Sequence, residues 1–289
     1  TNSGVSNKMI RTYVQQVLQQ FYENIQESLS PEIIENFHLI SKRDALLNAH
    51  FPKNQEYLSK AQNRLKFEEL FFIQLELLTK KLINKTKIKG VVFKNVGAHF
   101  TTFYDNYLPF DLTNAQKRVL KEIRKDVASG AQMNRLLQGD VGCGKTVVAT
   151  IAAIDCIEAG FQVAFMAPTE ILAEQHYEKL INWFKDTSYE ILLLTGSMPK
   201  KAKLETYLKI EKGSADIVIG THALFQEAVT FNNLGFYIID EQHRFGVEQR
   251  MLLKNNSKNL QGFEPHQLMM SATPIPRTLS MSFFAHMDV

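Results

Sequence analysis

The stretch that decides the fold is Gly139-Asp140-Val141-Gly142-Cys143-Gly144-Lys145-Thr146, in which glycine, four residues, glycine, lysine and threonine follow one another. This spacing is the P-loop pattern. Its glycines allow backbone conformations that other residues resist, so successive N–H groups can turn toward one centre at the start of a helix. An apolar run precedes the stretch and a helical run, 145–157, follows it. The pattern therefore predicts a phosphate-binding loop between a strand and a helix.

From about residue 108 onward, short runs rich in Val, Ile and Leu alternate with helical stretches. This alternation is typical of a parallel sheet with crossover helices, and hence of an α/β fold. The helix 145–157 is apolar on most faces and stops before Gly160, which predicts burial against the sheet and a glycine C-cap. Six strands are expected, near residues 135–138, 163–166, 191–194, 217–219, 237–239 and 268–270.

The first hundred or so residues have a different texture, because apolar positions recur at three and four and predict helix after helix. The clearest helix, 59–82, is apolar nearly all round, so we expect it to be buried between helices or against a neighbouring domain. The lysines within 80–89 either contact phosphate or form a solvated helix end. We expect two domains, an all-α linker region over 1–106 and an α/β domain over 107–289.

The composition is that of an ordinary globular protein, with 45% hydrophobic and 22% charged residues, and it excludes disordered and collagen-like chains. No run of 18 apolar residues and no secretory pattern is found, so we expect no membrane span and a cytoplasmic location. Two cysteines, Cys143 and Cys156, exclude a disulfide framework, and no Cys/His cluster has zinc spacing. The net charge is +3, and the basic excess lies in residues 1–100, where 14 Lys+Arg face 9 Asp+Glu, whereas residues 101–289 carry 19 against 21.

Two acidic residues, Asp240 and Glu241, directly follow the strand expected at 237–239. Alone, such a pair is commonly an exposed turn, but here it follows a P-loop and ends a parallel strand, where open α/β sheets bind ligands. Asp240 and the Thr146 hydroxyl are then expected to hold Mg²⁺, and Lys145 to bridge the β and γ phosphates. Glu241 is expected to orient and deprotonate the attacking water. The site is therefore expected to use ATP and Mg²⁺.

Further stretches resemble, in order, the motifs of superfamily 2 helicases, and most closely those of the RecG family of branched-DNA translocases. Residues 64–75 resemble the helix that precedes the motor in RecG, which makes the match specific to that family. Cys143 departs from the family pattern, where a small residue such as serine is usual. The segments that carry the resemblance are 112–116, 166–176 (motif Ia), 194–197 (motif Ib), 220–224, 240–247 (motif II) and 271–279 (motif III).

The resemblance implies roles for residues outside the P-loop. Gln116 is expected to pair with the adenine base. Backbone amides and hydroxyls of three loops are expected to bind DNA phosphates, with a turn or helix cap as the structural alternative at each position. The loop residues are Pro168, Thr169, Thr195, Gly196, Thr221 and His222. The residues expected to couple the nucleotide site to lobe movement are Gln242, His243, Arg244, Ser271, Ala272 and Thr273.

The resemblance implies an ATP-dependent helicase or translocase lobe that acts on branched double-stranded DNA, at stalled forks and Holliday junctions, in recombination and repair. The motor of Mfd, the transcription-repair coupling factor, is the alternative resemblance, but Gln242, Ser271 and the 64–75 helix favour RecG. A P-loop nucleotide switch is a second alternative, against which no guanine-reading Asn-Lys-x-Asp follows the P-loop. An idle scaffold is disfavoured because the candidate catalytic residues are all present.

A motor of this type needs a second RecA-like lobe, whose arginine stabilises the transferred phosphate, and RecG also carries a wedge domain that splits forks. Only ten residues follow Leu279, and no segment resembles the wedge. We therefore expect a monomeric fragment, a helical linker with the first RecA-like lobe, that binds MgATP weakly and hydrolyses it very slowly. The resemblance places the parent protein in the bacterial cytoplasm, with the nucleoid.

Overall fold

The computed structural model describes residues 6–93, 102–103, 108, 111–226, 228–240 and 262–272. The chain forms two compact units, Thr1–Leu78 and Thr79–Val289. The predicted boundary between residues 106 and 107 stays a prediction. Within the described residues, no helix combines the length and apolar character that a membrane crossing requires.

The first unit is helical, as predicted. Serine side chains cap three of its helices: Ser6, Ser30 and Ser41 each accept a hydrogen bond from a backbone N–H in the first turn. The third of these helices ends at His50, because Pro52 follows and cannot continue it. The elements are α1 (Asn7–Phe21), η1 (Tyr22–Asn24), α2 (Pro31–Asn36), α3 (Lys42–His50) and the long α4 (Gln55–Lys87), whose residues from Thr79 onward belong to the second unit.

A buried ion-pair network holds α4 against the segments before it. The Arg64 side chain is fully buried, with Nη2 2.5 Å from Glu27 Oε1 and Nη1 2.7 Å from Glu68 Oε2. Lys42 Nζ lies 2.7 Å from the other oxygen of Glu68. Glu27 also accepts hydrogen bonds from the backbone N–H groups of Ser28 and Lys42. Since both carboxylates have several donors, this part of α4 is firmly placed.

The prediction that the helix 59–82 is buried between helices or against a neighbouring domain is not met along the second half of α4, where most of the described residues are exposed. Ala61 and Arg64 are buried, but Leu70 is 62% and Leu78 55% exposed. Contacts with the preceding segments hold the first half of α4, where Phe67 packs on Phe37 with ring centroids 4.8 Å apart. The apolar periodicity correctly predicted the helix but not the depth of its burial.

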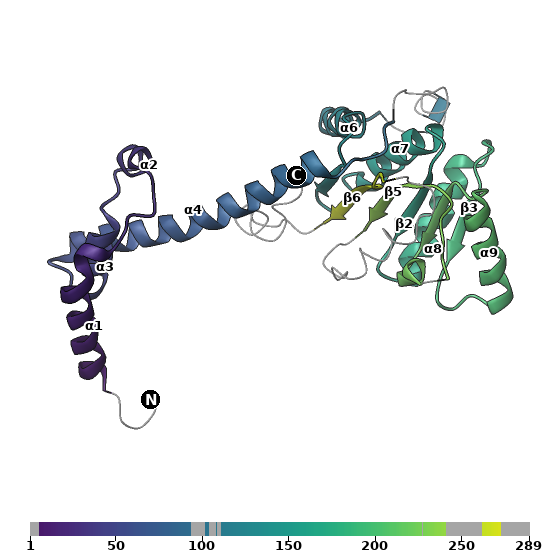
Figure 1. Cartoon of the computed structure of the whole chain (residues 1–289). Coiled ribbons are helices and arrows are strands. Elements are labelled where there is room, and N and C mark those ends of the chain that lie inside the picture. Colours follow the sequence, from purple (N-terminus) through teal and green to yellow (C-terminus); the bar gives the residue numbers. More distant parts are fainter. Residues whose placement is uncertain are drawn as a thin grey trace. The chain divides into compact units, whose positions relative to one another are not determined.

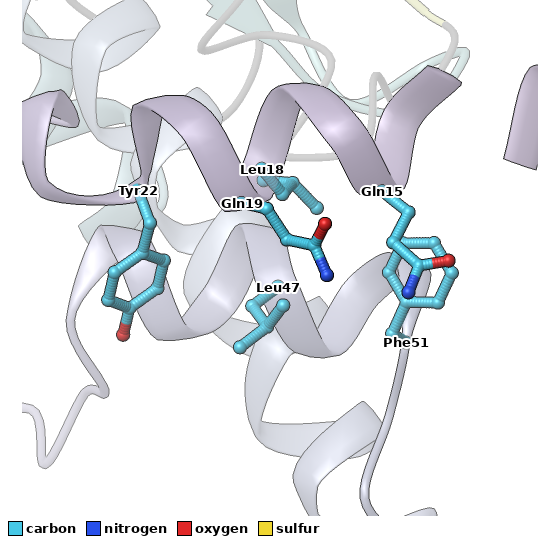
Figure 2. Close-up of a pocket in the computed structure, with 6 residues that line it drawn as sticks. All are labelled: Gln15, Leu18, Gln19, Tyr22, Leu47 and Phe51. Carbon is cyan, nitrogen blue, oxygen red and sulfur yellow. The ribbon is translucent and has the colours of Figure 1, made fainter. Parts of the chain in front are cut away.

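The helical unit also contains an apolar pocket of about 340 Å³. Figure 2 shows side chains of α1 facing Leu47 of α3, with Phe51 at one end of the pocket. Its lining residues are Gln15, Leu18, Gln19, Tyr22, Leu47 and Phe51. None of the candidate site residues lies there.

The second unit is built on one six-stranded sheet in which all pairs are parallel, so the predicted α/β fold is confirmed. The strand order is β1-β6-β5-β2-β4-β3. Each of the six predicted strands is present, and several extend by one to three residues at either end. The strands are β1 (Asn134–Gln138), β2 (Gln162–Met166), β3 (Ile191–Leu194), β4 (Ile217–Gly220), β5 (Leu234–Ile239) and β6 (His266–Ser271).

Helices cover both faces of this sheet (Figure 1). Successive strand residues alternate between two cores, because side chains along a strand point to opposite faces. Apolar residues of α6 (Asn114–Val127), α7 (Lys145–Glu158) and α8 (Glu170–Phe184) fill one core. Residues of α9 (Lys200–Lys212) and η2 (His222–Phe225) belong to the other. Gly160, at a φ of +83°, follows the end of α7, which confirms the predicted glycine cap.

Residues 88–93 are not helical, in contrast to the prediction for this region. They lie extended along the second unit, where Gly90 N donates to Gly130 O at 3.0 Å and Glu264 N to Lys89 O at 2.7 Å. His266 of β6 fixes the same segment, because its Nδ1 accepts from Met133 N at 2.9 Å while its Nε2 lies 2.5 Å from Val91 O. Burial lowers the pKa of this histidine to about 4.

Candidate nucleotide-binding site

The P-loop joins β1 to α7, as its pattern predicts. Gly142 and Gly144 have φ values of +81° and +86°, which favour glycine because other residues are strained there. Gly144 is the N-cap of α7 and provides no side chain to bond the first-turn amides. These N–H groups, together with the positive end of the helix dipole, form a cradle suited to an anion. The local sequence therefore builds the geometry that a phosphate requires.

Lys145 lies folded over this cradle. Its Nζ donates to Gly139 O at 2.7 Å and to Asp140 O at 2.9 Å, and it lies 4.0 Å from Cys143 Sγ. The ammonium group thus sits directly above the loop backbone, where a phosphate oxygen could replace the two carbonyls as its partner. Val141 is 88% exposed at the tip of the loop.

Gln116 contacts the P-loop from α6. Its Nε2 donates to Cys143 O at 2.9 Å, and its Oε1 accepts from Thr113 N at 2.8 Å, which completes a capping box at the start of α6. Arg124 fixes α6 on α7 through Asp155, with Nε 2.9 Å from Oδ2. Burial raises the pKa of Asp155, although Arg124 opposes this effect.

A pocket of about 440 Å³ lies between Gln116 and the P-loop. The apolar side chains of Val119, Leu137 and Val148 form one part of its lining, while Gln138 and Lys145 bring polar groups. Apolar walls with a few convergent polar groups are typical of a small-molecule site. The predicted adenine-contacting amide and the predicted phosphate loop therefore share one pocket.

Asp240 follows β5 at the same edge of the sheet as the P-loop. One strand, β6, separates β5 from β1, so Asp240 and the loop lie roughly 10 Å apart across the sheet. Asp240 N donates to Met166 O at 2.9 Å, and its Oδ2 lies 2.9 Å from His176 Nε2. The other predicted catalytic carboxylate, Glu241, lies outside the described residues.

Among the residues predicted to couple the site to lobe movement, Ser271 and Ala272 are described, and Gln242, His243, Arg244 and Thr273 lie outside the described residues. Ser271 is buried at the end of β6, and its carbonyl accepts from Gly139 N at 3.2 Å. This hydrogen bond ties the first residue of the P-loop to the strand between β1 and β5. A shift of β6 would therefore move the nucleotide pocket directly.

The three predicted DNA-contacting loops converge at the carboxyl ends of β2, β3 and β4. Thr169 caps α8 by accepting from Leu172 N at 3.3 Å, and Pro168 makes the turn before it. Gly196 and His222 are exposed. Thr195 and Thr221 are each only 1% exposed, so their hydroxyls do not face solvent. The structure thus offers backbone groups and His222 at this edge, rather than the two buried hydroxyls.

Two residues that the sequence analysis assigned no role link these features. Glu170, the first residue of α8, accepts from Ser197 N at 2.9 Å, and hydrogen bonds from Ser197 hold its pKa below the usual value. His176, six positions after Glu170 on α8, contacts Asp240. Both lie inside the 166–176 stretch, but their partners are 27 and 64 positions away, so no local spacing signals these contacts.

The donor set fits a magnesium ion held together with a nucleotide. No group of three or more His, Cys, Asp or Glu side chains that could hold a metal by itself occurs among the residues that the structure describes. Mg²⁺ usually takes one or two protein oxygens and completes its shell with phosphate and water. Thr146, beside the cradle, and Asp240, at the end of β5, are oxygen donors of this kind.

Comparison with known proteins agrees with this geometry. A protein-family model described as DEAD/DEAH box helicase matches residues 113–282. The ATP-dependent DNA helicase RecG of Thermotoga maritima is 44% identical over 287 residues, which cover 99% of this chain and 36% of the relative. The RecG of Streptococcus pneumoniae is 46% identical over 98% of this chain and 40% of the relative. The chain thus spans well under half the length of these curated relatives.

A solved structure with a similar fold is described as "Structure of RecG bound to three-way DNA junction". It is 42% identical to this chain, with a TM-score of 0.77, and the alignment covers 98% of this chain and 37% of that protein. The likeness therefore includes the helical unit as well as the sheet.

Proposed function

Because the chain belongs to the DEAD/DEAH box helicase family, we propose that it is the first RecA-like motor lobe, with the preceding helices, of an ATP-dependent helicase that acts on branched DNA. The observation that carries the proposal is the extent of the likeness to RecG. The relatives match 98–99% of the chain, so the match includes the helical unit outside residues 113–282. A shared motor alone would match only the sheet and its helices.

We propose ATP and Mg²⁺ as the cofactors of this lobe. The amides of the 139–144 loop would bind phosphate oxygens, and Lys145 Nζ would leave the carbonyls of Gly139 and Asp140 for the phosphate. Thr146 and Asp240 would hold Mg²⁺, while Glu241 would take the proton of the attacking water. When bound, MgATP supplies the phosphoryl group whose transfer to water drives the motor. The Gln116 amide would meet the adenine base.

We also propose that further chain supplies a second RecA-like lobe and a fork-splitting wedge domain. The relatives are more than twice as long as this chain, which leaves room for both. An arginine from a second lobe would stabilise the transferred phosphate, and lack of such a residue costs about 10³ to 10⁵ in rate. The lobe alone would therefore hydrolyse ATP very slowly. We further propose a monomer that works in the bacterial cytoplasm, with the nucleoid.

DNA would be bound through its backbone. The edge formed by Pro168, Thr169, Gly196 and His222 presents amides and an imidazole, groups that contact phosphates without reading sequence. Such binding weakens steeply with salt because counterions are released on association. Preference for branched DNA would then come from the wedge domain, and the lobe would supply force.

The test is the steady-state ATPase rate of the full-length protein with fork DNA, with linear duplex and without DNA. We expect stimulation chiefly by the fork and its loss in Lys145→Ala, since that side chain is the one cation over the loop backbone among the described contacts. Lys212→Ala, at the exposed end of α9, is the matched control and should retain the wild-type rate.

Equal stimulation by linear duplex would contradict the preference for branched DNA and favour an Mfd-like translocase. Absence of stimulation by either DNA would favour a nucleotide switch. Full activity in Lys145→Ala would refute the assignment of the P-loop.

A further inference from the structure

His176 lies between the candidate nucleotide site and the loops proposed to bind DNA. It projects from α8 toward the carboxyl end of β5, where its Nε2 is 2.9 Å from Asp240 Oδ2. A carboxylate oxygen only accepts, so the imidazole N–H donates. The histidine side chain is 11% exposed and that of Asp240 15%, which shields the contact from solvent. A shielded hydrogen bond to a carboxylate fixes the orientation of that carboxylate more firmly than an exposed one.

The position of the imidazole is itself determined by packing. Its ring lies 4.7 Å from the ring of Phe165 in β2, measured between centroids. On the same helix, Ala173, Leu180 and Phe184 are buried in the core below. The ring of His176 therefore moves with α8 and cannot readily swing away from it.

The first turn of α8 lies among the loops proposed to bind DNA. Glu170 receives a hydrogen bond from Ser197 N at 2.9 Å, and its carboxylate lies beside Gly196. Lys203 Nζ donates to Gly196 O at 2.6 Å, which ties the start of α9 to the same loop. A phosphate that settled on these loops would act on the start of α8 through Glu170.

The two contacts lie close together on one rigid element. Glu170 and His176 are six positions apart in the sequence, which corresponds to about 9 Å along a helix. The end of β2 leads into α8 within four residues, and Met166 O accepts the hydrogen bond from Asp240 N. Both the backbone and the side chain of Asp240 are thus attached to the segment that carries the DNA-facing turn.

We propose that His176 is a positioning residue that couples DNA binding at the start of α8 to the orientation of Asp240 in the nucleotide site. The inference rests on the proposed function, since it assumes that the 168–169, 196–197 and 222 loops meet DNA. When α8 shifts on DNA, the imidazole turns the Asp240 carboxylate with it. Coupling of this kind is reciprocal, so bound Mg²⁺-nucleotide must change the affinity for DNA by the same factor.

The test measures that factor in the full-length protein. The dissociation constant for a labelled fork DNA is measured by fluorescence anisotropy, with and without Mg²⁺ and a non-hydrolysable ATP analogue, and the ratio is the coupling factor. We expect at least about a 5-fold effect in the wild type, at the lower end of typical allosteric coupling. In His176→Phe, which keeps a ring against Phe165 but cannot donate a hydrogen bond, the factor should fall to within about 2-fold of unity.

Three further variants separate positioning from loss of structure. His176→Gln retains an N–H donor and should recover part of the coupling. Glu170→Ala removes the contact with Ser197 at the exposed end of the helix, leaves the core intact, and should also reduce the coupling. Gln175→Ala, an exposed neighbour on α8, should retain the wild-type factor. Affinity for the nucleotide without DNA is measured in each variant.

A wild-type coupling factor that persists in His176→Phe or in Glu170→Ala would overturn the inference and leave the proposed function intact. Equal loss in Gln175→Ala would also overturn it, because the effect would then belong to the helix as a whole. A wild type that binds no fork DNA, or binds it independently of nucleotide, would refute the proposed function together with the inference.

Discussion

Acidification should weaken the second unit through His266. This histidine is fully buried at the start of β6, where it accepts from Met133 N and contacts Val91 O. These contacts require a neutral ring with its proton on Nε2, because Nδ1 accepts a hydrogen bond. Protonation would place a second N–H against the Met133 amide and a charge in an apolar core. Burial accordingly lowers its pKa from 6.5 to about 4.

The magnitude follows from the difference in proton binding between the two states. Well above pH 6.5 the histidine is neutral in both the folded and the unfolded chain, so it contributes no pH dependence there. As the pH falls from 6.5 toward about 4, the unfolded chain binds a proton that the folded one does not, and the free energy of unfolding decreases. Between about pH 7.5 and about pH 5 the expected loss is about 2 kcal/mol.

The assay is urea unfolding followed by the fluorescence of Trp183, since it is the single tryptophan and lies in α8 of the second unit. The variant His266→Gln should be less stable at about pH 7.5 but should lack the 2 kcal/mol loss, so the two curves converge on acidification. His50→Gln, at an exposed helix end, should keep the wild-type pH dependence. An equal loss in wild type and His266→Gln would refute the reasoning.

Two further predictions concern the helical unit and the P-loop. Arg64→Ala leaves Glu27 and Glu68 without their buried partner, so hydrogen exchange in α3 and α4 should report a loss of about 3 kcal/mol. Arg43→Ala, whose ion pair with Glu23 is exposed, should lower the same local stability by less than about 1 kcal/mol. Equal losses in Arg64→Ala and Arg43→Ala would contradict the role of burial. Gly144→Ala strains a φ of +86° and places a Cβ against Gln116 Nε2, so affinity for a fluorescent nucleotide should fall at least about 10-fold. Gly160→Ala is the control, because Gly160 has a similar φ of +83° but open space around it. This variant should lower stability by about 1 kcal/mol and leave the affinity for the nucleotide unchanged.

The arrangement of the sheet would let the second unit hold both proposed ligands. Parallel strands all end at the same edge, so the P-loop after β1 and the 168–169 and 196–197 loops after β2 and β3 share that edge. The nucleotide pocket lies at the β1 side and the proposed DNA loops at the β2-β4-β3 side. Asp240, after β5, stands between them.

Local patterns predicted the second unit well. Four of the six predicted strands, those at 163–166, 217–219, 237–239 and 268–270, are apolar and buried throughout, and such runs are conspicuous because they contain no charged residue. The P-loop and the cap at Gly160 were predictable because positive φ values favour glycine at fixed places. The burial of α4 was not predictable, since an apolar periodicity indicates a helix but not which segments cover its apolar faces.

The sequence by itself determined where strands and helices follow one another along the chain, the phosphate cradle and the acidic residue after β5, because each depends on neighbours within a few positions. Only the tertiary structure decided which distant side chains meet. It brings His176 to Asp240 across 64 positions and Gln116 to the P-loop across 27. It also buries the hydroxyls of Thr195 and Thr221, and pairs Lys89 and Gly90 with residues just before β1 and β6. The physical reason is that such contacts follow from how strands are ordered in the sheet, which pairs segments far apart in the chain.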